Sequence, residues 1–472
     1  MTPELLERFI AIVGNKNTLG SGDDLTQYNH ENRGLYVGVT PLVLKPANTQ
    51  EISDIVRLAA ESGTALVPQG GHTGHVGGAV TDESGTQIVV SLERMNRVRE
   101  LDLQGNVVVC EAGCVLEAIQ KLTDENDRLF PLALGSQGSC QIGGNISTNA
   151  GGTGVLAYGN TRQLVMGLEV VLPSGDIWNG LRRLKKDNTG YDLKDLFIGA
   201  EGTLGIVTAA VLKLFPKPKG KAVAFCALAS VDDAVSLLGS ALETAGSSLT
   251  AFEFMADAAV ATTVAHMDGV RHPLASSHPW YVLMEISSGR SEDDANELMH
   301  AALGDALESR LVADAVIASS LQQQRDFWRL RETMPLAQKA VGGSMKHDIS
   351  IPVHRIADFL RRADKIIEMR IPGAIRYTFG HLGDGNIHYN VTQPTGADEK
   401  QFLARQGEIN DEIHDLVVAF EGSVAAEHGV GQLKRDLVAR TKSPVELSLM
   451  QSVKNAVDPQ GIMNPGKVLN AK

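Results

Sequence analysis

Two histidines near position 385 are spaced so that they could hold a metal ion. His381 and His388 flank a Gly-Asp-Gly-Asn turn, and Asp-Gly between two strand-like runs is a strong hairpin signal. If Leu382 and Ile387 close a four-residue loop, the two imidazoles become direct cross-strand neighbours, with Cβ atoms about 5 Å apart. Asn390 follows two residues after His388 and is expected on the same face. One short hairpin thus offers two imidazoles and an amide.

A third ligand and a base could come from the sequence Ala426-Glu427-His428. Glu427 would complete a site of two histidines and one carboxylate that keeps a position open for a substrate oxygen. His428 would then be the general base. The alternative at this point is a pair of solvated hairpin histidines and an unrelated Glu-His dipeptide.

Two glycine-rich stretches suit a ligand with a long phosphate-containing backbone. They cover 68–78 and 134–152, and the second is dominated by small residues and hydroxyls. Backbone N–H groups in such loops can bind pyrophosphate as an anion nest, although ordinary glycine turns are the alternative. The first stretch lacks the G-x-G-x-x-G spacing, so a Rossmann NAD site is disfavoured. Two separated loops favour a dinucleotide over a mononucleotide.

A segment with two prolines and three lysines, 215–221, divides the predicted elements into two parts. Before it the pattern predicts a helix over 49–61, strands over 87–91 and 107–111, a helix over 115–124 and a strand over 168–172. After it the pattern predicts an α+β domain over 222–425, with strands over 222–228 and 280–286 and helices over 232–245 and 291–309.

Two cations in this second part could hold a carboxylate. Arg331 lies in a helical segment that Pro335 is expected to end or kink. Lys346 begins a strand-like run in which it shares a face with Asp348 and Ser350. Guanidinium and ammonium groups bind carboxylates, although solvated surface cations are the usual alternative.

Composition limits the class of protein. A chain of 472 residues with 43% hydrophobic residues predicts a soluble globular protein of two or three domains. The net charge of −13 argues against nucleic acid or an anionic membrane as partner. Four cysteines without a C-x-x-C pair indicate a reducing compartment and no cysteine-ligated cluster. The absence of a signal peptide, transit peptide or long apolar run predicts a cytoplasmic protein without an integral membrane segment.

Taken together, these stretches resemble the FAD-linked oxidoreductases of the vanillyl-alcohol-oxidase type, in the branch of D-2-hydroxyglutarate and D-lactate dehydrogenases. The resemblance rests on seven stretches in the family's order: 68–74, 134–152, 185–193, 199–206, 380–390, 426–431 and 458–467. It implies an α+β fold with three parts. These are a two-lobed FAD-binding domain over 1–218 with its core over 41–218, an antiparallel-sheet cap domain over 219–425, and a C-terminal helical segment over 426–472 that packs back on the flavin domain.

The resemblance also implies roles for individual residues. His381, His388 and Glu427 match a divalent-metal site, usually zinc, and His428 matches the catalytic base. The expected substrate contacts are Arg331, Lys346 and Asn390, with Thr333 nearby. FAD would be bound by Pro68, Gln69, Gly70, Gly71, His72, Thr73, Gly74, Gly135, Ser136, Gly138, Ser139, Gly143, Gly144, Asn145, Thr148, Asn149, Gly151, Gly152, Glu201, Gly202, Gly205, Ile206 and Asn464.

Two positions depart from the pattern of this branch. His72 stands where close relatives usually have asparagine. A histidine after a Gly-Gly pair carries a covalent flavin bond in some distant members, so covalent attachment through His72 is left open. Pro335 stands where the branch often has a hydroxyl residue one turn after the arginine, which changes how the far end of the substrate would be held.

The implied activity is FAD-dependent, metal-assisted oxidation of a D-2-hydroxy acid to the 2-oxo acid by hydride transfer to flavin. Two cations and a metal favour a dicarboxylate, so D-2-hydroxyglutarate precedes D-lactate, D-malate and glycolate as the expected substrate. A flavin electron-transfer subunit without its own substrate is the alternative from another class, and His428, Arg331 and Lys346 argue against it. An acceptor other than NAD is expected, such as electron-transfer flavoprotein or a quinone, and a homodimer is left open.

Overall fold

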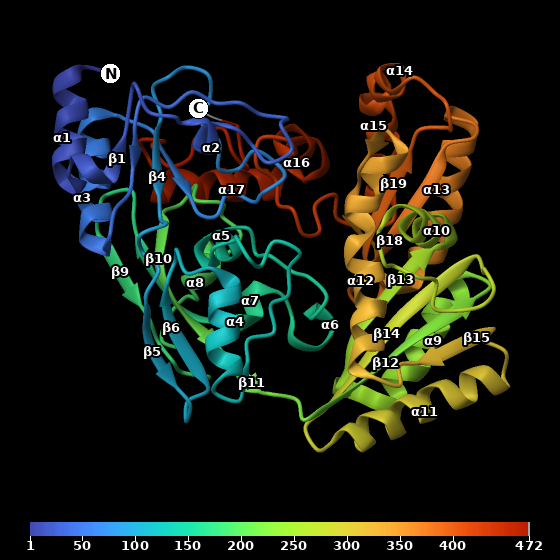
Figure 1. The fold of residues 1–472 in the computed structure, drawn as a ribbon. Coiled ribbons are helices and arrows are strands. Elements are labelled where there is room, and N and C mark those ends of the chain that lie inside the picture. Colours follow the sequence, from blue (N-terminus) through green and yellow to red (C-terminus); the bar gives the residue numbers. More distant parts are fainter. Residues whose placement is uncertain (471–472) are drawn as a thin grey trace. The chain divides into compact units, whose positions relative to one another are not determined.

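The structure is a computed structural model that describes residues 1–470, and it forms two compact units (Figure 1). Unit 1 comprises Met1–Gly151, Gly159–Pro216 and the chain from Glu427 onward. Unit 2 comprises Gly152–Tyr158 and Lys217–Ala426. The mixed helix and sheet architecture confirms the predicted α+β class. The sequence did not indicate that Gly152–Tyr158 would group with the second unit.

Unit 1 is built on two sheets. The first is four-stranded, in the order β1 (Thr18–Leu19), β2 (Val43–Leu44), β4 (Ile88–Ser91) and β3 (Leu66–Gln69), with β4 parallel to both β2 and β3. The second is five-stranded and antiparallel, in the order β5 (Val98–Asp102), β6 (Val107–Glu111), β10 (Ile206–Lys213), β8 (Val165–Val171) and β9 (Ile177–Gly180). Strands β6 and β10 are buried along almost their whole length, as their continuous apolar runs require.

Helices in unit 1 follow local capping signals. The side chain of Asn48, rather than Thr49, caps α3 (Thr49–Ser62) by accepting from the Glu51 amide at 2.9 Å, and Gly63 ends the helix in a left-handed conformation with φ 66°. The remaining helices of unit 1 are α1 (Pro3–Val13), α2 (Thr26–Asn29), α4 (Leu116–Asp124), α5 (Ile142–Ser147), α7 (Thr161–Leu164), α8 (Lys194–Phe197), α16 (Arg435–Thr441) and α17 (Pro444–Val457).

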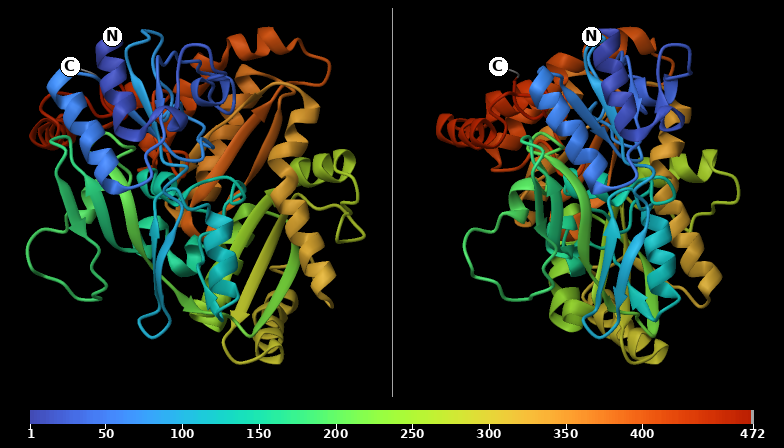
Figure 2. Two further views of the ribbon diagram at one scale, coloured as in Figure 1. Left: turned by 60° about the vertical axis from the view of Figure 1, so that its left-hand side comes forward. Right: turned by 90° about the vertical axis from the view of Figure 1, so that its left-hand side faces the viewer.

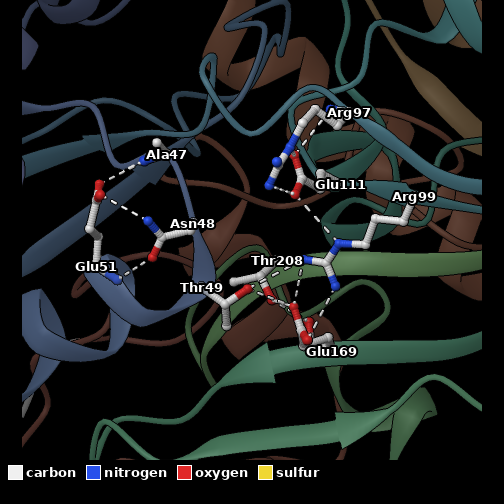
Figure 3. A network of polar contacts seen from close by, with 9 residues as sticks. All are labelled: Ala47, Asn48, Thr49, Glu51, Arg97, Arg99, Glu111, Glu169 and Thr208. Carbon is white, nitrogen blue, oxygen red and sulfur yellow. Dashed lines mark hydrogen bonds and ion pairs between the residues drawn. The ribbon is translucent and has the colours of Figure 1, made fainter.

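A network of ion pairs in the five-stranded sheet is joined to the start of α3 by hydrogen bonds of the Thr49 hydroxyl (Figure 3). Glu111, which is buried at the end of β6, pairs with Arg97 at 3.0 Å and with Arg99 at 3.4 Å. Arg99 also binds Glu169 of β8 at 3.0 Å, and that carboxylate accepts from the Thr49 hydroxyl at 2.7 Å. Because each buried carboxylate has a cationic partner, the network holds α3 against the sheet without leaving a buried charge unpaired.

Unit 2 contains an eight-stranded antiparallel sheet. Its order is β15 (Asp314–Ile317), β12 (Gly220–Leu228), β14 (Trp280–Ser288), β13 (Leu249–Ala256), β18 (Ile375–His381), β19 (Asn386–Thr392) and β16 (Ser344–Met345), and β17 (Asp348–Ser350) also pairs with β19. Its helices are α6 (Val155–Tyr158), α9 (Val231–Ala245), α10 (Asp257–His266), α11 (Glu292–Glu308), α12 (Leu321–Ala337), α13 (Ile356–Arg370), α14 (Glu399–Ala404) and α15 (Gln406–Ala419).

Helices α10 and α12 cover one face of this sheet, and Figure 2 shows α12 running along it. Phe327, Leu330 and Met334 of α12 share a buried cluster with Phe225 and Tyr281 of the sheet. The sequence predicted that Pro335 would end or kink this helix. The helix does not end there but continues to Ala337, and this packing explains why. The ring removes one backbone donor near the helix end, and the buried side chains on either side outweigh that cost.

The C-terminal chain of unit 1 returns to the first sheet. The Leu66 amide donates to the Ile462 carbonyl at 2.8 Å, and the Asn464 amide donates to the Leu66 carbonyl at 2.8 Å. Lys467 follows with only 3% of its surface exposed, and its Nζ donates to the Pro465 carbonyl at 3.4 Å. Burial lowers the pKa of Lys467 to about 8, and attraction to Asp82 opposes this shift. Within the described residues, no helix has the length and apolar character needed to cross a membrane.

The lowered pKa of Lys467 predicts a pH dependence of stability. Between pH 8 and about 10.5 the unfolded chain keeps a proton that folded Lys467 has lost, so the free energy of unfolding should rise across this interval. Lys467→Met should reduce that rise by roughly 2–4 kcal/mol, as measured by denaturant unfolding at pH 7, 8, 9 and 10. The exposed-lysine variant Lys365→Met is the control, and a slope in Lys467→Met equal to the control's would contradict the assignment.

Candidate active site

A cleft in unit 1 is lined by the glycine-rich stretches. Its empty volume, which includes space open to solvent, is about 870 Å³. The predicted residues that line it are Pro68, Gln69, Gly70, Gly71, His72, Thr73, Gly74, Gly143, Gly144, Asn145, Thr148, Glu201, Gly202, Gly205, Ile206 and His428. The cleft therefore brings together segments that are far apart in the sequence.

The other predicted cofactor residues do not line this cleft. Two of them, Ser139 and Asn464, contact segments that do. A Cβ on Gly71 would lie 2.1 Å from the Ser139 carbonyl, so the two loops pack backbone to backbone and need glycine there. Asn464 donates from Nδ2 to the carbonyls of Gly78 and Glu201, at 2.9 and 2.7 Å. Gly135, Ser136, Gly138, Asn149 and Gly151 also lie outside the lining, and Gly152 belongs to unit 2.

Two amide side chains in the lining have acceptor capacity for a ligand. The side-chain oxygens of Gln141 and Asn145 are buried and make no hydrogen bond to any residue that the structure describes. A buried oxygen without a partner is costly, so a ligand with N–H or O–H donors fits this part of the cleft. Sequence reasoning missed Gln141, although its position inside 134–152 was the available signal.

His72 is held in a left-handed conformation at φ 55°, with Nε2 only 2.7 Å from the His30 carbonyl. A carbonyl can only accept, so Nε2 carries the proton and Nδ1 keeps a lone pair. Burial lowers the pKa of His72, which favours this neutral imidazole. A covalent flavin bond through His72 stays a prediction.

Glu201 holds the loop that contains His428. Its carboxylate accepts from the amides of Val430 and Gly431, at 2.7 and 2.8 Å. Burial raises the pKa of the Glu201 carboxyl, and the two amide hydrogen bonds oppose that shift. The loop thus brings His428 into the lining of the cleft, where its ring packs edge to face against His75 with centroids 5.1 Å apart. His75 was not among the predicted site residues.

The hairpin in unit 2 forms with a register that differs from the prediction. His381 pairs with Asn386, and His388 pairs with Phe379, so the two histidines are diagonal and not direct cross-strand neighbours. The loop spans four residues, a short 3-10 turn and then Gly385 at φ 82°, and it is closed by His381 and Asn386 in place of the predicted Leu382 and Ile387. The two imidazoles nevertheless share a face, with ring centroids 5.8 Å apart.

Glu253 of β13 lies beside this hairpin and was missed by sequence reasoning. It pairs with His381 across the strands, and its Oε1 is 2.7 Å from His381 Nδ1. Its Oε2 is 2.8 Å from Arg331 Nη2, and the Arg331 guanidinium also stacks over the Phe379 ring at 4.8 Å. Arg331 is therefore a buried cation that is already paired with a carboxylate.

Strand β17 adds further polar groups to the same face. Asp348 pairs with His388 and Ser350 with Asn386, and the register shared with β16 places the exposed Lys346 level with Asn390. The predicted common face of Lys346, Asp348 and Ser350 agrees with this register.

The remaining predicted contacts have partners inside unit 2. Asn390 donates from Nδ2 to Gln338 Oε1 at 3.0 Å. The Thr333 hydroxyl donates to the Arg329 carbonyl of its own helix at 2.7 Å. The Ala426 amide donates to the Asp348 carbonyl of β17 at 3.4 Å, and Glu427 is the next residue in the chain.

Two family models match the chain. The model described as an FAD binding domain matches residues 40–180, and the model described as the C-terminal domain of FAD linked oxidases matches residues 217–468. The second match alone covers more than half of the 472 residues.

Curated relatives match over nearly the whole chain. The D-2-hydroxyglutarate dehydrogenase of Stutzerimonas stutzeri is 35% identical over 99% of both chains. The mitochondrial D-2-hydroxyglutarate dehydrogenase of Arabidopsis thaliana is 39% identical over 98% of this chain and 80% of its own. The D-2-hydroxyglutarate–pyruvate transhydrogenase of Saccharomyces cerevisiae is 35% identical over 99% of this chain and 94% of its own.

Solved structures share the fold at lower identity. A p-cresol methylhydroxylase with bound substrate has a TM-score of 0.75 at 17% identity, covering 99% of this chain and 96% of its own. An alkyldihydroxyacetonephosphate synthase has a TM-score of 0.75 at 16% identity, covering 98% of this chain and 85% of its own.

Proposed function

We propose that this chain oxidises D-2-hydroxyglutarate to the corresponding 2-oxo acid. The chain belongs to the family of FAD-linked oxidases, as its sequence predicted, and is an FAD-dependent oxidoreductase. The observation that carries this proposal is the agreement of the relatives. Proteins from a plant, a yeast and a bacterium, 35% to 39% identical over at least 98% of this chain, all carry D-2-hydroxyglutarate in their names.

The cleft of unit 1 fits the proposed position of FAD. Segment 68–78 and helix α5 line the cleft with several glycines and thus with little side-chain bulk. The side-chain oxygens of Gln141 and Asn145, which make no hydrogen bond within the described residues, can accept from the cofactor. Bound FAD supplies the acceptor for the hydride that leaves C2 of the substrate. His428, held in the lining by Glu201, is the proposed base that takes the proton of the C2 hydroxyl.

His381, His388 and Glu427 are the proposed ligands of a divalent ion, and zinc suits two imidazoles and a carboxylate. Two observations support this set. The two histidines share a face of the hairpin, and Glu427 follows Ala426, which is tied to the strand that pairs with His388. An ion bound there supplies a Lewis acid that lowers the pKa of the C2 hydroxyl.

Lys346 and Asn390 are the proposed contacts for substrate carboxylate, because the register of β16 and β17 with β19 sets Lys346, which lies between β16 and β17, level with Asn390. Arg331 was predicted to bind the substrate carboxylate, but it offers that carboxylate less charge than expected because Glu253 already balances it. The proposed electron acceptor is not NAD but an electron-transfer flavoprotein or a quinone. The name of the yeast relative, a transhydrogenase that pairs D-2-hydroxyglutarate with pyruvate, indicates that acceptors differ within the family.

A substrate panel tests the proposed specificity. With an artificial electron-accepting dye, kcat/KM should be at least tenfold higher for D-2-hydroxyglutarate than for D-lactate, D-malate or glycolate. The reason is that it alone among the four acids is a five-carbon dicarboxylate. The L enantiomer of 2-hydroxyglutarate is the matched control. A higher kcat/KM for one of the three other acids would move the proposal to that acid.

Replacing His428 tests its role as base. His428→Ala should retain bound flavin, as seen in the visible spectrum, while kcat falls by roughly 10²–10⁴-fold because proton removal from the hydroxyl loses its acceptor. His300→Ala, at an exposed position on α11, is the control and should keep wild-type turnover. Turnover of His428→Ala within twofold of wild type would exclude His428 as the base.

A further inference from the structure

Glu253 is an almost fully buried carboxylate in the middle of the polar end of the unit 2 sheet. It lies on β13 with 1% of its surface exposed, directly across from His381 of β18. A carboxylate in this position is strongly destabilising unless partners offset the loss of water. Each of its two oxygens has one: Oε1 faces His381 Nδ1 at 2.7 Å, and Oε2 faces Arg331 Nη2 at 2.8 Å.

The contact with His381 determines which ring nitrogen can bind a cation. The Glu253 carboxylate accepts at Nδ1, so the proton of a neutral imidazole stays on Nδ1 and the lone pair stays on Nε2. The same hydrogen bond fixes the rotation of the ring. His388 lies diagonally across the hairpin on the same face, so the second imidazole is beside the one that Glu253 orients.

The contact with Arg331 ties α12 to the same carboxylate. Arg331 comes from the helix that covers this face of the sheet, and its guanidinium is stacked on Phe379, the register partner of His388. Glu253 therefore joins His381 to the arginine that stacks on the register partner of His388. Toward α10 and α12 the same face continues into the apolar cluster.

We propose that Glu253 is a positioning residue that holds His381 in the tautomer and orientation needed to bind a divalent cation. The inference rests on the proposed function, because His381 and His388 are its proposed metal ligands. It adds a residue that neither the motif nor the hairpin predicts, and it assigns Glu253 an effect on metal affinity in addition to its effect on folding.

The chain offers a matched control for a purely structural role. Glu285 of β14 is also a buried glutamate of the same sheet, with its Oε1 2.9 Å from Lys221 Nζ and its Oε2 3.0 Å from Trp328 Nε1. Like Glu253, it pairs with a cation at one carboxylate oxygen. Unlike Glu253, it forms no hydrogen bond with a histidine among the described residues, so its loss should affect stability without affecting a metal.

The test is a titration of metal-free protein with Zn²⁺ in competition with a chromophoric chelator, which requires no turnover. Glu253→Gln keeps an acceptor but loses the charge and should weaken Zn²⁺ binding about tenfold, whereas Glu253→Leu with Arg331→Met should weaken it about a hundredfold. The double variant also removes the arginine that would otherwise be left buried and unpaired. Glu285→Gln should bind Zn²⁺ like the wild type, and His388→Ala should lose binding. Circular dichroism checks folding of each variant.

The outcomes separate the two proposals. If wild type binds Zn²⁺ and His388→Ala does not, but both Glu253 variants keep wild-type affinity, the role of Glu253 is overturned and the metal site stands. If Glu285→Gln weakens binding as much as Glu253→Gln, the effect belongs to sheet stability and the inference also fails. If wild type and His388→Ala bind Zn²⁺ equally, the proposed metal site fails, and the role of Glu253 fails with it.

Discussion

The hydrogen bonds between Glu201 and the Val430–Gly431 turn are the constraint on which the candidate active site of unit 1 depends. The Glu201 amide also donates to the Ser147 carbonyl at 2.8 Å, and its carbonyl accepts from Asn464. Glu201 therefore joins α5, the His428 loop and the C-terminal chain. These three segments are far apart in sequence, and the hydrogen bonds of the buried Glu201 hold them together around the cleft.

In unit 2, too, a buried glutamate joins residues that are far apart in the sequence. One face changes from an apolar cluster under α12 to a polar region at the end of the β18–β19 hairpin, and Glu253 lies at that boundary with Arg331 and His381 as partners. The loss of water by the buried Glu253 carboxylate is offset because one oxygen faces the Arg331 guanidinium and the other accepts from His381. The hydrogen bond from Nδ1 to Glu253 fixes the orientation of the His381 ring, as the proposed metal site requires.

Sequence patterns predicted what local chemistry decides. The helix expected over 49–61 is α3, because its cap and its periodicity are both local, and the hairpin at 380–390 forms because Asp-Gly specifies a turn. The hairpin register was wrong because the 3-10 turn and Gly385 set it, and the dipeptide alone does not distinguish these turns. Glu253 and Gln338 were missed because they meet His381 and Asn390 through pairings 128 and 52 residues apart, which no local pattern encodes.

The most direct measurement of the central claim is the anaerobic visible spectrum of the purified protein during addition of D-2-hydroxyglutarate. An FAD-dependent dehydrogenase of this acid should be yellow, and its oxidised flavin band should bleach within seconds of mixing, whereas the L enantiomer should leave the band in place. A yellow protein whose band D-2-hydroxyglutarate does not bleach would contradict the proposed substrate. A colourless protein that does not take up added FAD would contradict the assignment of the cleft to flavin.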